Sequence, residues 1–222
     1  MSACRIKPEM HFEVRYLIKE ETALQLREHV REYLDIEEWC VGRPGYAAPI
    51  ETVYLDSPDL RLFWDTVARP DNHLQLRLRY WHGSRTGPVT LEIKQRCADG
   101  VQKEKAILSQ AGAEMLLRGE LPEQDPLLRN SPSSVFAVEH FWELTQKFNA
   151  QPSLRVSYTR EGYATDDGTT TVNFDRGIAA QSWPEGNPGV PLASHWRMPG
   201  DKVVLELKFK YRFPDWFREM AE

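Results

Sequence analysis

Residues 74–81 read LQLRLRYW, in which apolar and polar side chains alternate along the first six positions. This period of two is typical of a β-strand, because successive side chains of a strand point to opposite faces. One face would carry three leucines, and the other would carry Gln75, Arg77, Arg79 and Trp81. Such a polar face fits either a solvated sheet or the wall of a channel that holds an anion.

Further segments of the chain show the same period, and a few show the helical one. We predict strands at 11–18, 51–56, 74–81, 89–96, 101–108, 154–164, 169–175 and 202–210. We predict helices at 20–34, 110–119 and 133–148, and a short one in the C-terminal FPDWFREM. The strands come in two groups without strand–helix–strand alternation, which favours an antiparallel α+β sheet or barrel. The length suits a single domain over residues 1–222.

Four of these strands share one pattern, with an apolar face and a face of charged residues. The charged faces carry, strand by strand, His11, Glu13 and Arg15; Arg77 and Arg79; Glu92, Lys94 and Arg96; and Glu206, Lys208 and Lys210. A wet face of an antiparallel sheet explains any one of them. If the sheet closed into a barrel, the charges would crowd into its lumen, where only a bound polyanion would make them tolerable.

Composition excludes several classes of protein. The chain has 222 residues, a net charge of -5 and a pI of about 5.8, which disfavours a nucleic-acid binder but permits a local basic site. Cys4, Cys40 and Cys97 form no metal-binding spacing, so we expect free thiols in a reducing cytoplasm. We see no signal peptide and no membrane span, and therefore expect a cytoplasmic protein.

The charged residues suit phosphate chemistry. A guanidinium donates two parallel hydrogen bonds to a phosphate, which favours arginine in phosphate sites. Glu13, Glu92 and Glu206 could hold a hard divalent cation, Mg²⁺ or Mn²⁺, that bridges phosphate oxygens.

Several motifs in this order carry a family resemblance: FEVRYLI, TVYLDS, RLRY, LEIK, RVSYTREGY, TVNFD and LELKF followed by PDW. The chain resembles the catalytic domain of the vacuolar transporter chaperone (VTC) complex, a triphosphate tunnel metalloenzyme close to the CYTH group. The resemblance runs from about residue 11 to 218. It implies an eight-stranded antiparallel β-barrel that transfers the γ-phosphate of ATP onto polyphosphate with Mn²⁺ or Mg²⁺.

The resemblance also implies roles for individual residues. Arg77 and Arg79 match the paired arginines of the phosphate site, and Lys94 matches a tunnel lysine. Arg160 matches a further phosphate ligand, and Glu206 matches the metal-binding glutamate. Additional phosphate-binding residues would be Arg15, Arg96, Tyr158, Lys103, Lys105, Lys208 and Lys210, and additional metal ligands Glu13 and Glu92.

The sequence departs from the family pattern at several positions. Arg15 replaces the usual lysine of the first strand, and His11 stands where hydrolytic CYTH members have a glutamate. Thr171 stands where the family has an arginine, so one phosphate ligand is missing unless Arg176 or another loop residue replaces it. Arg96 stands where some relatives have a histidine. We find no SPX or membrane domain, so a membrane-protein partner is unknown.

Three functions remain open from the sequence. The first is a polyphosphate polymerase that uses ATP. The second is a triphosphatase of the same fold, acting on tripolyphosphate or a nucleotide, with Glu13, Glu92 or Glu104 as the general base. The third is a non-catalytic polyphosphate-binding protein, an interpretation that the loss of an arginine at Thr171 keeps open.

Overall fold

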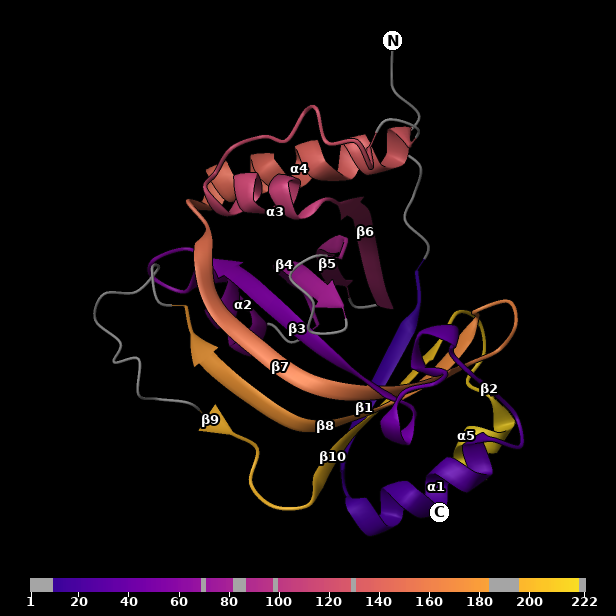
Figure 1. Ribbon diagram of the computed structural model, residues 1–222. Helices are drawn as coiled ribbons and strands as arrows, with labels where there is room; N and C mark the ends of the chain where they lie inside the picture. The colour runs from indigo at the N-terminus through magenta and orange to yellow at the C-terminus, as the bar shows by residue number, and fades with distance from the viewer. Residues whose placement is uncertain are drawn as a thin grey trace. The chain divides into compact units, whose positions relative to one another are not determined.

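The computed structural model describes residues 10–68, 71–81, 87–97, 100–128, 131–183 and 196–219 (Figure 1). The chain forms two compact units. The first comprises the described residues of 1–10, 51–156 and 180–195, and the second those of 11–50, 157–179 and 196–222. Some strands contribute residues to both units. The single domain over residues 1–222 stays a prediction.

The strands in the described part of the chain are β1 (Phe12–Lys19), β2 (Asp35–Ile36), β3 (Ala47–Asp56), β4 (His73–Trp81), β5 (Val89–Cys97), β6 (Gly100–Leu108), β7 (Gln151–Ala164), β8 (Thr170–Ser182), β9 (Trp196–Arg197) and β10 (Lys202–Phe209). Eight of them follow one hydrogen-bonded order, β1-β10-β8-β7-β3-β4-β5-β6. The β1–β10, β10–β8, β4–β5 and β5–β6 pairs are antiparallel. The predicted antiparallel α+β fold is confirmed.

The helices are α1 (Glu20–Val30), α2 (Arg61–Ala68), α3 (Gln110–Leu117), α4 (Pro132–Phe148) and α5 (Asp215–Glu219), with 3₁₀ turns at Glu38–Cys40 and Pro44–Tyr46. Only α2 was not predicted. Its first turn is held by Asp56, whose carboxylate accepts hydrogen bonds from the backbone N–H groups of Leu62 and Phe63, at 2.8 and 2.9 Å. No helix in the described part of the chain is long and apolar enough to cross a membrane.

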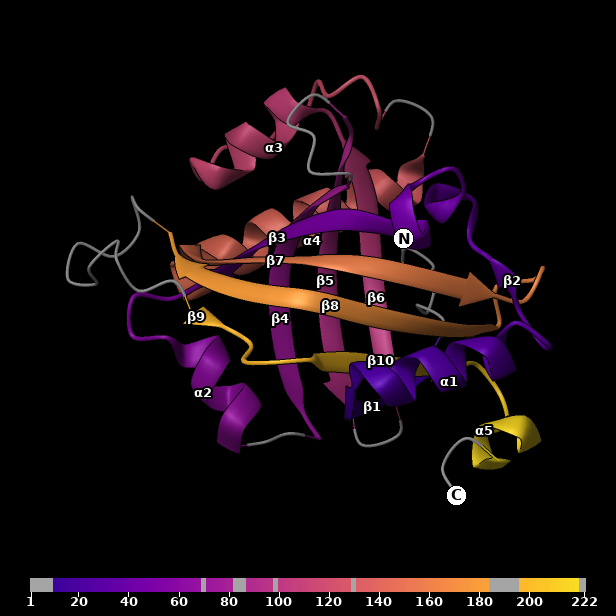
Figure 2. The same cartoon turned by 60° about the horizontal axis from the view of Figure 1, so that its bottom comes forward.

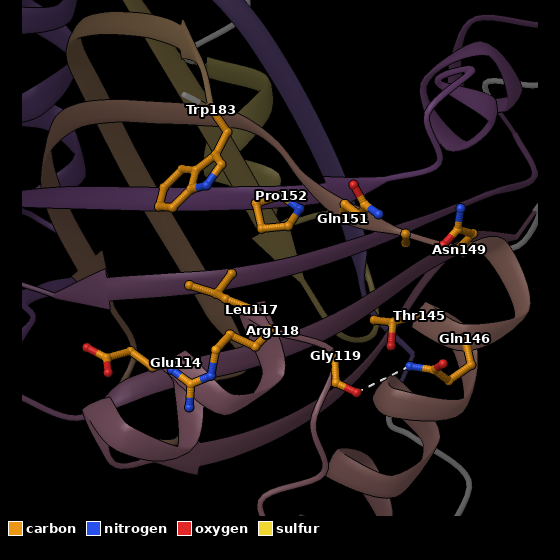
Figure 3. Close-up of a pocket in the computed structure, with 11 residues that line it drawn as sticks. Glu114, Leu117, Arg118, Gly119, Thr145, Gln146, Asn149, Gln151, Pro152 and Trp183 are labelled. Carbon is orange, nitrogen blue, oxygen red and sulfur yellow. Dashed lines mark hydrogen bonds between the residues drawn. The ribbon is translucent and has the colours of Figure 1, made fainter. Parts of the chain in front are cut away.

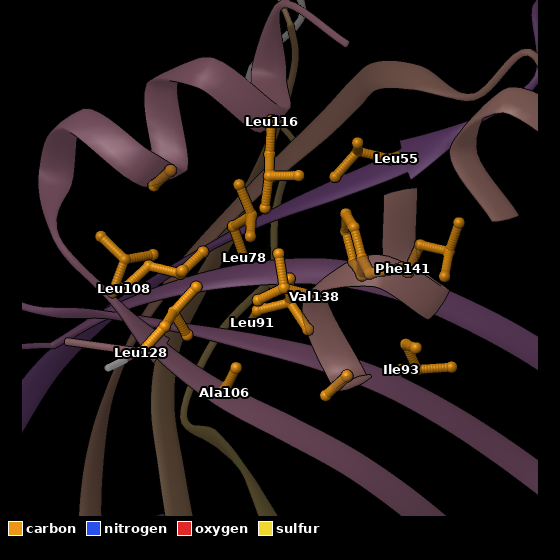
Figure 4. Packing of buried hydrophobic residues seen from close by; sticks show 14 of the residues in the cluster. Leu55, Leu78, Leu91, Ile93, Ala106, Leu108, Leu116, Leu128, Val138 and Phe141 are labelled. Atoms are coloured by element: carbon orange, nitrogen blue, oxygen red, sulfur yellow. The ribbon is translucent and has the colours of Figure 1, made fainter. Parts of the chain in front are cut away.

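The core of the first unit lies on the leucine face of β4, as the alternation predicts. Leu76 and Leu78 are fully buried there with Leu91 and with Phe141 of α4 (Figure 4). Helices α3 and α4 cover β5 and β6, and α2 packs on β4 (Figures 1 and 2). The N–H of Ser134 bonds the side chain of Ser131, which caps α4.

The second unit has its own core on the apolar faces of β8 and β10. Phe174, Leu205 and Leu207 are buried beneath α1 and α5. Trp216 of α5 stacks on Tyr33 with ring centroids 4.8 Å apart, which holds the C-terminal helix near the end of α1.

Two of the three cysteines lie in the described part of the chain, and both are free thiols, as predicted. Burial raises the pKa of the Cys40 thiol to about 11, so this thiol is unreactive near neutral pH. Cys4 lies outside the described residues.

Replacing Gly112 by alanine should destabilise the first unit. A Cβ at this helix position would lie 2.0 Å from Oδ2 of Asp125. Asp125 is buried and fixed by hydrogen bonds from the N–H and hydroxyl of Ser109, so it cannot retreat without cost. We expect a loss of about 1–3 kcal/mol in the free energy of unfolding, measured by chemical denaturation. Gly87→Ala, where a Cβ meets nothing within 4 Å, is the control, and equal stability of the two variants would contradict the prediction.

Candidate functional site

The charged sides of β4, β5 and β6 form a single surface. The β-ladder pairs Arg77 with Glu92 and Glu92 with Lys105, and in the next row it pairs Lys94 with Lys103. Directly paired residues of antiparallel strands lie on the same face, so these side chains are neighbours. We call this surface the basic face; its charged members are Arg77, Arg79, Glu92, Lys94, Arg96, Lys103 and Lys105.

Much of the basic face is buried. Arg77, Arg79, Glu92 and Lys94 are 6, 7, 2 and 3% exposed. Nε of Arg77 donates to Oε2 of Glu92 at 2.6 Å, and its NH1 lies 3.5 Å from the hydroxyl of Tyr54. Burial alone would raise the pKa of Glu92, but Arg77 and Arg79 hold it well below its usual range. Arg77 and Glu92 therefore form an ionised pair. The hydrogen-bond donors of Arg77 are largely occupied by Glu92 and Tyr54.

Arg79 differs from Arg77 in its contacts. Its NH1 reaches Oε1 of Glu92 only at 3.5 Å, and its guanidinium lies over the ring of Trp81 at 5.7 Å. Its Nε is buried and has no hydrogen-bond partner among the described residues. A buried donor without a partner costs about 1–3 kcal/mol, so a hydrogen bond to this Nε would be favourable.

The charge on this surface is unequal. Six cationic side chains of the described strands β4–β6 share the face with one carboxylate, that of Glu92. Lys94 lies directly opposite Lys103, and like charges in that position destabilise a sheet. A surface with this excess of cations among the described strands suits an anion of several charges.

A second set of charges lies on β1, β10, β8 and β7 in the other unit. We call it the carboxylate cluster; its members are Glu13, Arg15, Arg160, Asp175, Glu206 and Lys208. Three cations and three carboxylates balance here, unlike on the basic face.

Glu206 lies at the centre of the carboxylate cluster and is 2% exposed. Its Oε1 accepts from NH2 and Nε of Arg15, at 2.6 and 2.9 Å. Its Oε2 lies 2.5 Å from Nζ of Lys208, 3.3 Å from NH2 of Arg160 and 3.2 Å from the amide nitrogen of Asn173. Both oxygens therefore accept hydrogen bonds from several donors at once.

Arg160 is held by a carboxylate that the sequence did not indicate as a site residue. Its Nε and NH2 donate to the two oxygens of Asp175 at 2.6 and 2.7 Å. The ring of Tyr158 lies 5.3 Å below the guanidinium. Arg160 is thus fixed in place within the second unit, with one edge toward Glu206.

The carboxylates of this cluster permit a limited metal site. Glu13 and Glu206 both contact Arg15, at 3.3 and 2.6 Å, whereas Glu92 belongs to the other unit. Among the residues that the structure describes, no three His, Cys, Asp or Glu side chains gather as a metal site. These two carboxylates fit Mg²⁺ or Mn²⁺, which commonly take one or two protein carboxylates and complete their shell with water and phosphate oxygens.

The stability of the second unit should depend on the ionisation of Glu206. Burial alone would raise its pKa, but Lys208, Arg160 and Arg15 hold the pKa well below the ordinary 4.5. The carboxylate therefore stabilises the fold above about 4.5, and this contribution is lost as the pH falls through the lower pKa of the folded state. We expect Glu206→Gln to melt lower than the wild type near pH 7, and the two melting temperatures to converge on acidification.

The measurement is thermal unfolding between about pH 7 and pH 3, the range in which carboxylates titrate. Glu139→Gln, at an exposed position of α4, should follow the wild type throughout and serves as the control. A constant difference between Glu206→Gln and the wild type across this range would contradict the prediction.

The missing family arginine has no replacement in Arg176. Asp175 and Arg176 are adjacent on β8 and so point to opposite faces. Nε of Arg176 donates to Glu20 at 2.9 Å, and its NH1 donates to Glu161 at 2.9 Å, away from the carboxylate cluster. Thr171 does lie on the cluster's face, opposite Lys208, and its buried hydroxyl has no hydrogen-bond partner among the described residues.

The structure thus gathers the predicted residues into two sets. All of those on β4, β5 and β6 fall on the basic face, with Arg96 half-buried at the end of β5. Those on β1, β7 and β10 fall in or beside the carboxylate cluster, and Lys210 follows the end of β10. Sequence reasoning did not find Tyr54 or Asn173. The sequence predicted a strand that ends at Asp175. In the structure β8 continues past Asp175, and its side chain lies on the same face as that of Asn173.

A further cavity among the described residues adjoins neither set of predicted residues. It has a volume of about 600 Å³ and lies in the first unit, where the ends of α3 and α4 meet the start of β7 (Figure 3). Leu117, Gln146 and Trp183 line it, and no predicted site residue does. We assign it no role in the proposed function.

The described strands form an antiparallel α+β fold, with arginines and carboxylates buried on the charged sides of strands in each unit. The model of the VTC domain matches residues 10–222, and the chain therefore belongs to the VTC-domain family. The predicted resemblance is confirmed. No curated protein matches the chain in sequence.

The chain is similar to several solved structures at low sequence identity. A putative adenylate cyclase from Bacillus halodurans has 13% identity and a TM-score of 0.53, over 93% of this chain and 83% of that one. The PH1012 protein from Pyrococcus horikoshii has 12% identity and a TM-score of 0.47, over 96% of this chain and 86% of that one. At this identity the likeness to the first concerns the fold alone.

Proposed function

We propose that the protein transfers the γ-phosphoryl group of ATP to phosphate or to the end of a polyphosphate chain, as a polyphosphate polymerase. Membership of the VTC-domain family and the excess of cations on the basic face support this proposal. The observation that carries it is Arg79, a buried cation whose Nε has no acceptor among the described residues, beside the ion pair of Arg77 and Glu92.

In the proposed reaction, an oxygen of the acceptor phosphate forms a bond to the γ-phosphorus. The bond from that phosphorus to the β,γ-bridging oxygen breaks, and ADP leaves. Arg79, Lys94, Lys103 and Lys105 would bind the phosphate oxygens and stabilise their charge, with Arg77 kept in place by Glu92. Phosphoryl transfer needs little covalent participation by the protein, so positioned cations can supply most of the catalysis.

A divalent cation would be held by the carboxylates of Glu13 and Glu206. When bound, Mg²⁺ or Mn²⁺ supplies charge neutralisation at phosphate oxygens. Arg15, whose side chain is 50% exposed, contacts both carboxylates, so a cation bound there would compete with its guanidinium. Lys208 and Arg160 remain as fixed donors around Glu206.

Hydrolysis is the second candidate, because one observation favours it. Nε2 of His11 lies 2.9 Å from Oε1 of Glu13. A carboxylate that orients an imidazole and stabilises its protonated form makes a general base, which could take a proton from an attacking water. Glu92 is a poor base because its pKa is held so low, and Glu104 is bonded to Nδ1 of His140 at 2.9 Å.

The test incubates purified protein with ATP and Mg²⁺ or Mn²⁺, and follows released phosphate and phosphatase-sensitive polymer in the same samples. Polymer formation supports the polymerase. Phosphate release without polymer, lost in His11→Ala, moves the assignment to a hydrolase. Tripolyphosphate binding without turnover would leave a phosphate-binding protein, and the absence of both binding and turnover would refute the proposal.

A further inference from the structure

A cavity of about 460 Å³ lies in the first unit, beside helix α2. It is lined by residues of α2, of the end of β3, of the start of β4 and of β7. The lining residues that matter here are Tyr54, Phe63, Leu74, Gln75, Leu76 and Leu154. We call this cavity the α2 pocket.

The walls of the α2 pocket are mainly apolar. Leu76 is fully buried, whereas the ring of Phe63 is 50% exposed and Leu154 is 37% exposed. Small-molecule sites are commonly of this kind, about 300–1,000 Å³ with apolar walls and a few polar groups. Gln75 and the hydroxyl of Tyr54 supply such polar groups. The pocket is therefore suited to a flat, largely apolar ring system.

Two lining residues of the α2 pocket also adjoin the basic face. The hydroxyl of Tyr54, a lining residue, lies 3.5 Å from NH1 of Arg77. Gln75, another lining residue, is two positions before Arg77 on β4 and pairs with Lys94, so its side chain is on the basic face. A ligand that occupied both places would have an apolar ring at one end and several negative charges at the other.

We infer that the α2 pocket binds the base and ribose of a nucleoside triphosphate whose phosphates lie on the basic face. This inference rests on the proposed function and adds to it the place where the donor nucleotide is recognised. The exposed ring of Phe63 offers a surface on which a base can stack. Gln75 offers an amide donor and acceptor for the ribose or the base edge.

The experiment separates the two ends of the ligand. Binding of ATP and of tripolyphosphate, each with Mg²⁺, is measured by titration calorimetry on wild type and on Leu154→Trp, which fills the pocket. Val135→Trp, at a position of α4 that is also 37% exposed and outside the pocket, is the matched control. We expect Leu154→Trp to weaken ATP roughly tenfold, as the loss of one stacked, buried ring would, and to leave tripolyphosphate within about twofold. Val135→Trp should change neither.

Each of the following results would overturn the inference. Unchanged ATP affinity in Leu154→Trp would place the base elsewhere. Equal losses for ATP and tripolyphosphate would mean that the pocket does not discriminate the nucleoside. Wild-type protein that binds neither ligand would refute the proposed function itself. If Leu154→Trp does not fold, Phe63→Ala gives the same comparison at a half-exposed position, with a smaller expected loss of ATP affinity alone.

Discussion

Arg79→Gln should abolish measurable turnover of ATP and weaken tripolyphosphate binding by about 10²-fold, with little loss of stability. A charge-assisted hydrogen bond contributes about 1.5–3 kcal/mol, and a bidentate guanidinium makes two of them. The fold loses little, because Arg79 reaches Glu92 only at 3.5 Å and its buried Nε bonds no described residue. Turnover assays, calorimetry with tripolyphosphate and thermal unfolding measure the three effects.

The control for this prediction is another arginine of the same unit. Arg118 pairs with Glu120 at 3.2 Å on the surface, with a side chain that is 56% exposed. Arg118→Gln should leave turnover, binding and stability unchanged, since exposed ion pairs contribute about 0–1 kcal/mol. Tripolyphosphate binding by Arg79→Gln at wild-type affinity would mean that this arginine serves the fold rather than the ligand.

Arg77→Ala should instead destabilise the protein, by about 3–5 kcal/mol. The substitution leaves Glu92 ionised and 2% exposed without its closest cation. Most of the lost stability comes from the buried Glu92 carboxylate that no longer has Arg77 beside it. The double variant Arg77→Ala/Glu92→Ala should therefore recover part of the loss, as denaturant unfolding of all four members of the cycle would show.

An ion pair of the same unit provides the comparison for Arg77. Arg155 contacts Glu51, but their side chains are 36 and 20% exposed. Arg155→Ala should cost no more than about 1 kcal/mol, because solvent replaces the lost partner. A double variant no more stable than Arg77→Ala alone would show that the loss does not arise from the stranded carboxylate.

The two sets of charges suggest different roles because their balances differ. The basic face has many cations for one carboxylate and so favours a polyanion. In the carboxylate cluster, Glu206 and Asp175 neutralise the cations that they contact, so a divalent cation on Glu13 and Glu206 would have to compete with Arg15. The effects of Arg79→Gln and Glu206→Gln should accordingly differ: the first would remove a proposed phosphate ligand, and the second should chiefly alter stability.

Local sequence was sufficient to predict most elements and the composition of the basic face. The alternation of 74–81 determines which side chains share a face of the strand. A shift by one residue would exchange the two faces and would remove Leu76 and Leu78 from the core. The helix at 133–148 was predicted from its apolar stripe, and the structure begins it one residue earlier, at Pro132. Helix α2 escaped prediction because Asp56, which holds its first turn, reads in sequence as the end of a strand.

Tertiary structure alone decided the partners of each charge. Periodicity places Arg160 on a face, but only the pairing of distant strands puts Asp175 beside it and leaves Arg176 with Glu20 on the opposite side. The same holds for Tyr54, whose hydroxyl lies near Arg77 although the two residues are 23 positions apart in the sequence. The sequence by itself determined which residues are charged and which face they occupy, because parity along a strand is local. Register, burial and the resulting pKa shifts depend on contacts between distant segments, and these exist only once the sheet has formed.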